Sequence, residues 1–186
     1  GGGQFATLYT HIDEFVQSVN MITPSGNLES RRLPGSGAGP SEERFYLGSE
    51  GILGIITSAW MRLLDIPTFK KTVTVAFPTF EAGAEAVKTL SQSGLNPSNA
   101  RLVDAMEAFL NRLGNGQSAV LILGFESHQR DVTFLMREAL DLCKGHGGKW
   151  DEKRLTENTR SEKGDAWKNS FLLIPYLRDE VIRLGI

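Results

Sequence analysis

The 186-residue chain has a single cysteine, Cys143, so no disulfide can form within it. It has no dense run of lysine and arginine, and its formal net charge is −2 at pH 7. Such a sequence does not indicate a nucleic-acid partner, because proteins of that class usually carry a basic patch. The longest apolar stretch, residues 51–61, is too short to span a bilayer. No secretory signal is visible, so we predict a cytoplasmic protein without a transmembrane segment.

Histidine is also scarce, and its spacing argues against a metal site. His11, His128 and His146 are far apart in the sequence and form none of the usual metal-binding patterns. Hydrophobic residues make up 40% of the chain and charged residues 23%, which is ordinary for a globular protein with a real core. Cys143 lies on the apolar side of a predicted helix, so we expect a small core residue and not a nucleophile.

The sequence changes character near Pro67, which predicts two domains, residues 1–66 and 67–186. In the first, residues 7–19 indicate a short helix or a mixed segment, and residues 59–64 a strand. Residues 21–30 indicate strand, turn and strand, because their centre has the residues that a tight turn needs.

The second part alternates strand and helix patterns. The order predicts a small α+β layer, an antiparallel sheet with helices packed against it. Asp104 is a candidate N-cap because Glu107 follows at the spacing of a capping box. Strands are predicted at 71–77, 100–104 and 118–126, and helices at 79–93, 105–113, 129–144 and 175–183, with a solvated charged loop at 149–168.

The most informative motif is the run GSEGILGIIT at residues 48–57, in which Gly48, Gly51 and Gly54 recur at a spacing of three. Glycine allows positive φ and close approach of the backbone to a ligand, and successive free N–H groups suit a pyrophosphate. The same run could also be a corner between two strands with no ligand. The run alone does not decide between these two interpretations.

Together, several motifs resemble the vanillyl-alcohol-oxidase superfamily of FAD-linked oxidases, also called the p-cresol-methylhydroxylase (PCMH) type. YTHIDEFV, MITPSGNLES and GSEGILGIIT are similar to the second half of its FAD-binding domain. VAFPTFEAGAEAV, ARLVDAMEAF and PYLRDEVIRLG are similar to the start of the cap domain in the alkylglycerone-phosphate synthase branch. The resemblance implies an α+β fold, with part of the FAD domain at 1–66 and part of a ferredoxin-like cap at 67–186.

The resemblance also implies roles for individual residues. Arg101 matches an arginine that the synthase branch needs for activity, and Arg178 matches one that binds the substrate, plausibly its phosphate or carboxylate. Without the family, Arg101 could equally be a solvated strand residue, and Arg178 with Asp179 a surface ion pair. The residues implied to contact FAD are Gly2, Gly3, Glu50, Gly51, Ile52, Leu53, Gly54, Ile55 and Ile56.

Two departures from the family bear on function. Ile52 stands where threonine is usual, so a hydroxyl is lost while the backbone N–H remains. The connection 104–118 is shorter than the segment that helps to build the lipid tunnel of the synthase, which argues against a long acyl substrate. The resemblance also implies that the chain is a fragment, which alone should bind FAD weakly and be inactive.

The sequence thus predicts part of an FAD-dependent oxidoreductase or synthase that acts on a small anionic substrate, with a homodimer possible. Two alternatives stay open. One is a cofactor-free α+β interaction module, and the other is a 2-hydroxy-acid dehydrogenase of the D-lactate or glycolate type.

Overall fold

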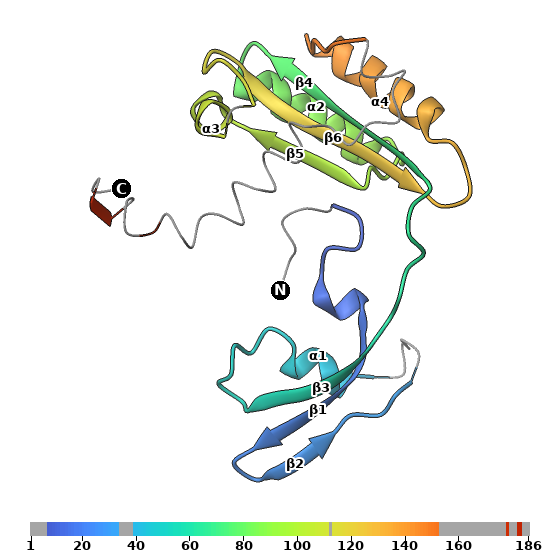
Figure 1. Cartoon of the computed structure of the whole chain (residues 1–186), viewed down its shortest axis with the longest axis vertical. Coiled ribbons are helices and arrows are strands. Elements are labelled where there is room, and N and C mark those ends of the chain that lie inside the picture. The colour runs from blue at the N-terminus through green and yellow to red at the C-terminus, as the bar shows by residue number, and fades with distance from the viewer. Residues whose placement is uncertain (1–6, 34–38, 112, 153–177, 179–181, 184–186) are drawn as a thin grey trace. The chain divides into compact units, whose positions relative to one another are not determined.

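The computed structural model describes residues 7–33, 39–111, 113–152, 178 and 182–183 (Figure 1). The chain divides into two compact units, Gly1–Asp65 and Ile66–Ile186. Each unit is described by itself below. No helix in the described part of the chain is long and apolar enough to cross a membrane.

The first unit is built on a three-stranded antiparallel sheet in the order β2-β1-β3 (Figure 1). The predicted strand, turn and strand over 21–30 is confirmed, and the hydroxyl of Thr23 closes the turn by donating to the carbonyl of Gly26 at 2.9 Å. The elements of this unit are the 3-10 helix η1 (Ile12–Glu14), the strands β1 (Val16–Thr23) and β2 (Gly26–Glu29), the helix α1 (Glu42–Tyr46) and the strand β3 (Ile55–Met61).

One prediction for this unit needs correction. The strand expected at 59–64 begins four positions earlier, at Ile55, because β3 pairs with β1 through Ile22↔Ile55 as well as Val16↔Met61. Strand pairing with distant residues decided this boundary, and local propensity did not. The segment 7–19 is mixed, as predicted, with the short η1 followed by the start of β1 at Val16.

The second unit is a three-stranded antiparallel sheet in the order β4-β6-β5, so the most apolar strand lies in the centre (Figure 1). The helices α2 and α4 cover one face of this sheet, and the α+β class is confirmed. Its elements are β4 (Phe69–Phe77), α2 (Phe80–Gln92), β5 (Asn99–Val103), α3 (Ala105–Leu110), β6 (Ala119–Ser127) and α4 (Thr133–Gly145).

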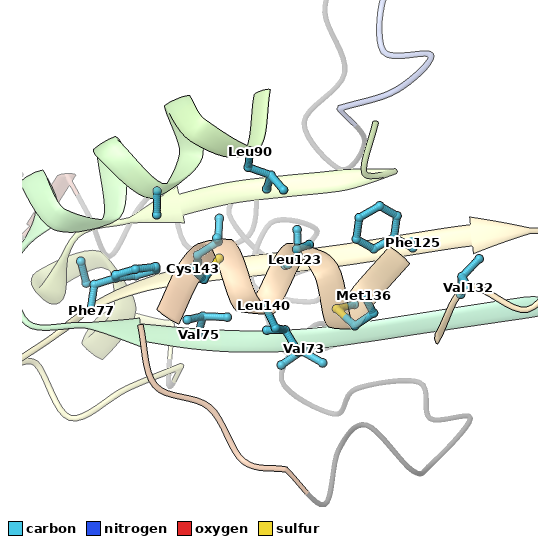
Figure 2. Packing of buried hydrophobic residues seen from close by; sticks show 14 residues of the cluster. Val73, Val75, Phe77, Leu90, Leu123, Phe125, Val132, Met136, Leu140 and Cys143 are labelled. Carbon is cyan, nitrogen blue, oxygen red and sulfur yellow. The ribbon is translucent and has the colours of Figure 1, made fainter. Parts of the chain in front are cut away.

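The main core lies between this sheet and the two helices. Figure 2 shows side chains of β4 and β6 meeting those of α2 and α4. Cys143 is one of them, fully buried, which confirms it as a core residue, and burial raises the pKa of its thiol to about 11. The labelled members of this core are Val73, Val75, Phe77, Leu90, Leu123, Phe125, Val132, Met136, Leu140 and Cys143.

The opposite face of the sheet is covered only in part. Val120 and Ile122 of β6 are buried against α3 and Leu113, whereas Thr72 and Thr74 of β4 are half-buried. Strand residues alternate between the two faces, so all of these side chains point away from α2 and α4. This face, which the described residues cover only in part, is here called the open face.

Both predicted helix boundaries around β6 were wrong by several residues. The helix expected at 105–113 ends at Leu110, where the N–H of Leu113 turns back to the carbonyl of Ala108 at 2.8 Å. The helix expected at 129–144 begins at Thr133, because the hydroxyl of Ser127 accepts the N–H groups of the next turn and Asp131 accepts the N–H and hydroxyl of Thr133. Side-chain acceptors in a tight turn delayed the start of this helix.

Candidate functional site

The glycine run follows α1 as a series of turns that leads into β3. Four of its residues have positive φ angles: 77° at Gly48, 51° at Glu50, 87° at Gly51 and 152° at Gly54. Glycine adopts this conformation without strain, but for Glu50 it is uncommon and often marks a site where the backbone is held for a purpose. The run is therefore a specifically shaped turn.

Several N–H groups in this turn have no acceptor among the described residues, and two of them, at Glu50 and Gly51, are consecutive. The N–H groups of Ser49 and Ile52 donate to the carbonyls of Tyr46 and Ser49, at 3.2 and 3.1 Å. Those of Glu50 and Gly51 have no acceptor among the residues that the structure describes. A Cβ added at Gly51 would meet nothing within 4 Å, so the backbone is open to an approaching group. This arrangement fits a phosphate oxygen, and FAD carries a pyrophosphate.

Gly54 has a different role from Gly51. Its φ is 152°, and a Cβ there would lie 2.4 Å from the carbonyl oxygen of Ile22. This glycine is therefore required by the packing of β3 against β1 whether or not a ligand binds. Ile52 and Ile55 are 84% and 70% exposed, so the predicted FAD-contacting residues form an open apolar and backbone surface.

The remaining predicted cofactor residues are only partly visible. Gly2 and Gly3 lie outside the described residues. Leu53 is half-buried and Ile56 is 41% exposed. All the described members of the predicted FAD set belong to the first unit, whereas Arg101 and Arg178 belong to the second. Their assignment to FAD and substrate therefore stays a prediction.

Arg101 lies in β5 opposite Ile122 of β6, so it is on the open face of the sheet. Its guanidinium Nη2 is 4.0 Å from Oε1 of Glu107, and the two side chains are 30% and 40% exposed. Glu107 is held by the N-cap of α3, where Oδ1 of Asp104 accepts its N–H at 2.7 Å, as predicted. The separation of 4.0 Å is too long for a hydrogen bond, so this contact is an ion pair only.

Arg178 is exposed, and most residues around it in the sequence lie outside the described part, as do most of the predicted helix 175–183 and loop 149–168. No group of histidine, cysteine, aspartate and glutamate that could hold a metal ion occurs among the described residues. The chemistry available here is therefore that of backbone donors and of cationic side chains.

A pocket of about 490 Å³ lies on the open face, and the sequence did not predict it. Its floor is formed by Thr74, Ala76 and Val120, and its walls include Ser118 and Lys149. Arg101 does not line it. The only local signal for this pocket is the pair Gly147-Gly148, which turns the chain from α4 back to the edge of β4.

Comparison with known proteins places these features in a family. The family described as "FAD linked oxidases, C-terminal domain" matches residues 66–184, most of the second unit. Among curated proteins, the alkyldihydroxyacetonephosphate synthase of Dictyostelium discoideum is 27% identical over 95% of this chain and 32% of its own length. The mitochondrial D-lactate dehydrogenase [cytochrome] of Arabidopsis thaliana is 26% identical over 89% of this chain and 30% of its own length.

Solved structures agree with these relatives. A crystal structure of alkyldihydroxyacetonephosphate synthase, another name for alkylglycerone-phosphate synthase, superposes with a TM-score of 0.69 and 26% identity, over 92% of this chain and 35% of that one. p-Cresol methylhydroxylase with substrate bound shares the fold, with a TM-score of 0.64 and 17% identity over 89% and 39% of the two chains. The chain thus spans about a third of the length of the curated relatives that it matches.

Proposed function

Because the chain belongs to the family of FAD linked oxidases, C-terminal domain, we propose that it works as part of a flavoenzyme of the alkyldihydroxyacetonephosphate synthase type. In this proposal the first unit contributes one wall of the FAD site and the second unit contributes the cap that receives the substrate. FAD, when bound, supplies either hydride acceptance or flavin chemistry without net oxidation. The chain's own residues bind and orient the cofactor and the substrate, and they exclude water from the site.

The observation that carries the proposal is the pair of bare N–H groups at Glu50 and Gly51. Backbone donors at a positive-φ turn suit phosphate oxygens because their geometry is fixed before the ligand arrives. The exposed faces of Ile52 and Ile55 lie next to these donors in the chain and would cover an apolar part of the same ligand. An interaction module without cofactor would need neither the bare donors nor the strained Glu50.

For the substrate we propose a small molecule with an anionic group, held by Arg101 and Arg178. A guanidinium stays charged and can grip a carboxylate or phosphate with two parallel hydrogen bonds. Arg101→Lys should weaken substrate binding, since it keeps the charge but removes the paired donors.

A 2-hydroxy acid is the second candidate substrate. The D-lactate dehydrogenase match and the short connection from Asn111 to Ser118 favour it over a long-chain lipid. Mixing D-lactate or glycolate with the flavin-loaded whole enzyme, of which this chain is proposed to form a part, tests this candidate. Bleaching of the flavin absorbance would favour the dehydrogenase, and an unchanged spectrum would favour the synthase.

The glycine turn can be tested with a matched pair of variants. Gly51 and Gly94 have φ angles of 87° and 77°, and a Cβ at either meets nothing within 4 Å. Alanine should therefore strain both sites equally, by about 1–2 kcal/mol. We expect Gly51→Ala to lower the FAD affinity, measured by titrating the protein with FAD, whereas Gly94→Ala should leave it unchanged. Equal FAD affinities in the two variants would reject the assignment of this turn.

A further inference from the structure

We propose that the pocket on the open face is a binding site for a small oxyanion, a carboxylate or a phosphate, with Lys149 as its cationic group. This site is separate from the arginines assigned above, because neither lines the pocket. Binding at this site requires no flavin, so it can be tested independently of the proposed function.

Lys149 is fixed in place by its backbone. It forms a two-bond antiparallel bridge with Ala76, whose N–H donates to the Lys149 carbonyl at 2.8 Å and whose carbonyl accepts the Lys149 N–H at 2.9 Å. Residues directly opposite each other in such a bridge have their side chains on the same side. Since Ala76 forms part of the pocket floor, the Lys149 side chain stands at the wall of the same pocket.

The turn that precedes Lys149 accepts only glycine at position 148. A Cβ at Gly148 would lie 2.8 Å from the carbonyl oxygen of Cys143 and 2.8 Å from Cγ1 of Val75. Gly147, with a φ of 81°, completes the reversal of the chain after α4. The close packing of this turn holds the lysine backbone at the edge of β4 and so limits the positions that its ammonium can reach.

Lys149 is exposed, and within the described ranges no carboxylate forms an ion pair with its ammonium. Asp151, two residues further along the chain, also lines the pocket. The hydroxyls of Thr74 and Ser118, which also line the pocket, can donate to an anion. Ala76 and Val120 give the floor an apolar part. A small organic acid with a short carbon skeleton, or inorganic phosphate, matches this combination.

The test uses the whole 186-residue chain labelled with ¹⁵N and without FAD. Inorganic phosphate, glycolate and the uncharged glycolamide are titrated separately while amide spectra are recorded. We expect saturable shifts at Lys149, Thr74 and Ser118 with phosphate or glycolate, and none with glycolamide. Whichever oxyanion saturates at the lower concentration identifies the source of the ligand chemistry.

Variants distinguish oxyanion binding at a defined site from general attraction of anions to a charged surface. Lys149→Gln should weaken oxyanion binding about three- to tenfold, as expected for one partly exposed charge contact, while Lys149→Arg should retain it. Lys144→Gln, which removes an exposed lysine of α4, should have no effect. The fold is checked in the same spectra, and the bridge uses only backbone atoms of Lys149. Shifts that fail to saturate, or that persist unchanged in Lys149→Gln, would overturn the proposal.

Discussion

Gly54 lies so close to Ile22 that a Cβ on Gly54 would come within 2.4 Å of the Ile22 carbonyl oxygen. The contact joins the end of the glycine run to β1 and brings β3 into register. This contact also shows that two glycines with similar positions in the sequence motif have different roles. Gly54 is needed for packing, whereas Gly51 leaves its backbone open.

Gly54→Ala should therefore destabilise the first unit by about 3 kcal/mol, the sum of a steric clash and a strained φ. Gly26→Ala is the control, because Gly26 also has a positive φ, 129°, but a Cβ there meets nothing within 4 Å. Urea unfolding of both variants measures the difference. If Gly54→Ala were no less stable than Gly26→Ala, the contact with Ile22 would not be the constraint.

The stability of the corner between β5 and α3 should depend more on the N-cap at Asp104 than on the ion pair between Arg101 and Glu107. Asp104→Ala removes the side-chain acceptor of the Glu107 N–H and should lower the free energy of unfolding by about 1 kcal/mol. Glu107→Gln keeps that N–H and removes only a half-exposed ion pair with Arg101, worth less than about 1 kcal/mol. Denaturant titrations of the two variants give the comparison, and a larger loss for Glu107→Gln would contradict it.

The buried thiol of Cys143 should make stability depend on alkaline pH. Burial raises its pKa from 9.0 to about 11 in the folded protein, so the folded state holds the proton more tightly than the unfolded state. The contribution is complete below pH 9.0 and is lost as the pH rises through about 11, a change of roughly 3 kcal/mol.

Cys143→Ala removes this titration, so the stability difference between the variant and the natural protein should shift over that pH range. Thermal unfolding at a series of alkaline pH values measures it. A difference that stays constant with pH would show that the thiol does not ionise on unfolding.

A tertiary hydrogen bond should couple α2 to the end of α4. Oγ1 of Thr89 donates to the carbonyl of Glu85 at 2.9 Å and lies 3.0 Å from Nε2 of His146. Thr89→Val leaves this ring nitrogen unpaired and should destabilise the protein by about 1–2 kcal/mol. Ser91→Ala is the matched control, since Ser91 makes the same kind of bond within α2, to Val87, and no bond to α4. A double-mutant cycle of Thr89→Val with His146→Ala should show coupling, and additive losses would exclude it.

Much of the second unit was predictable because its signals are local. The alternation along β4 and the unbroken apolar run of β6 are visible in the order of the residue types, and the cap at Asp104 is a contact over three residues. The start of α4 was missed because Ser127 and Asp131 compete for the backbone donors that a helix would use. In the first unit β3 was displaced because its pairing partner β1 is distant in the chain.

The candidate site likewise has features that the sequence predicts and features that only the structure shows. Residue type and spacing were enough to identify the glycine run, the family motifs, Arg101 and the N-cap beside it. Only the tertiary structure distinguished the open backbone at Gly51 from the packed backbone at Gly54, and only it placed Lys149 in a pocket. The physical reason is that free space and charge neutralisation depend on which distant residues come near, and β1 and β4 supplied those neighbours.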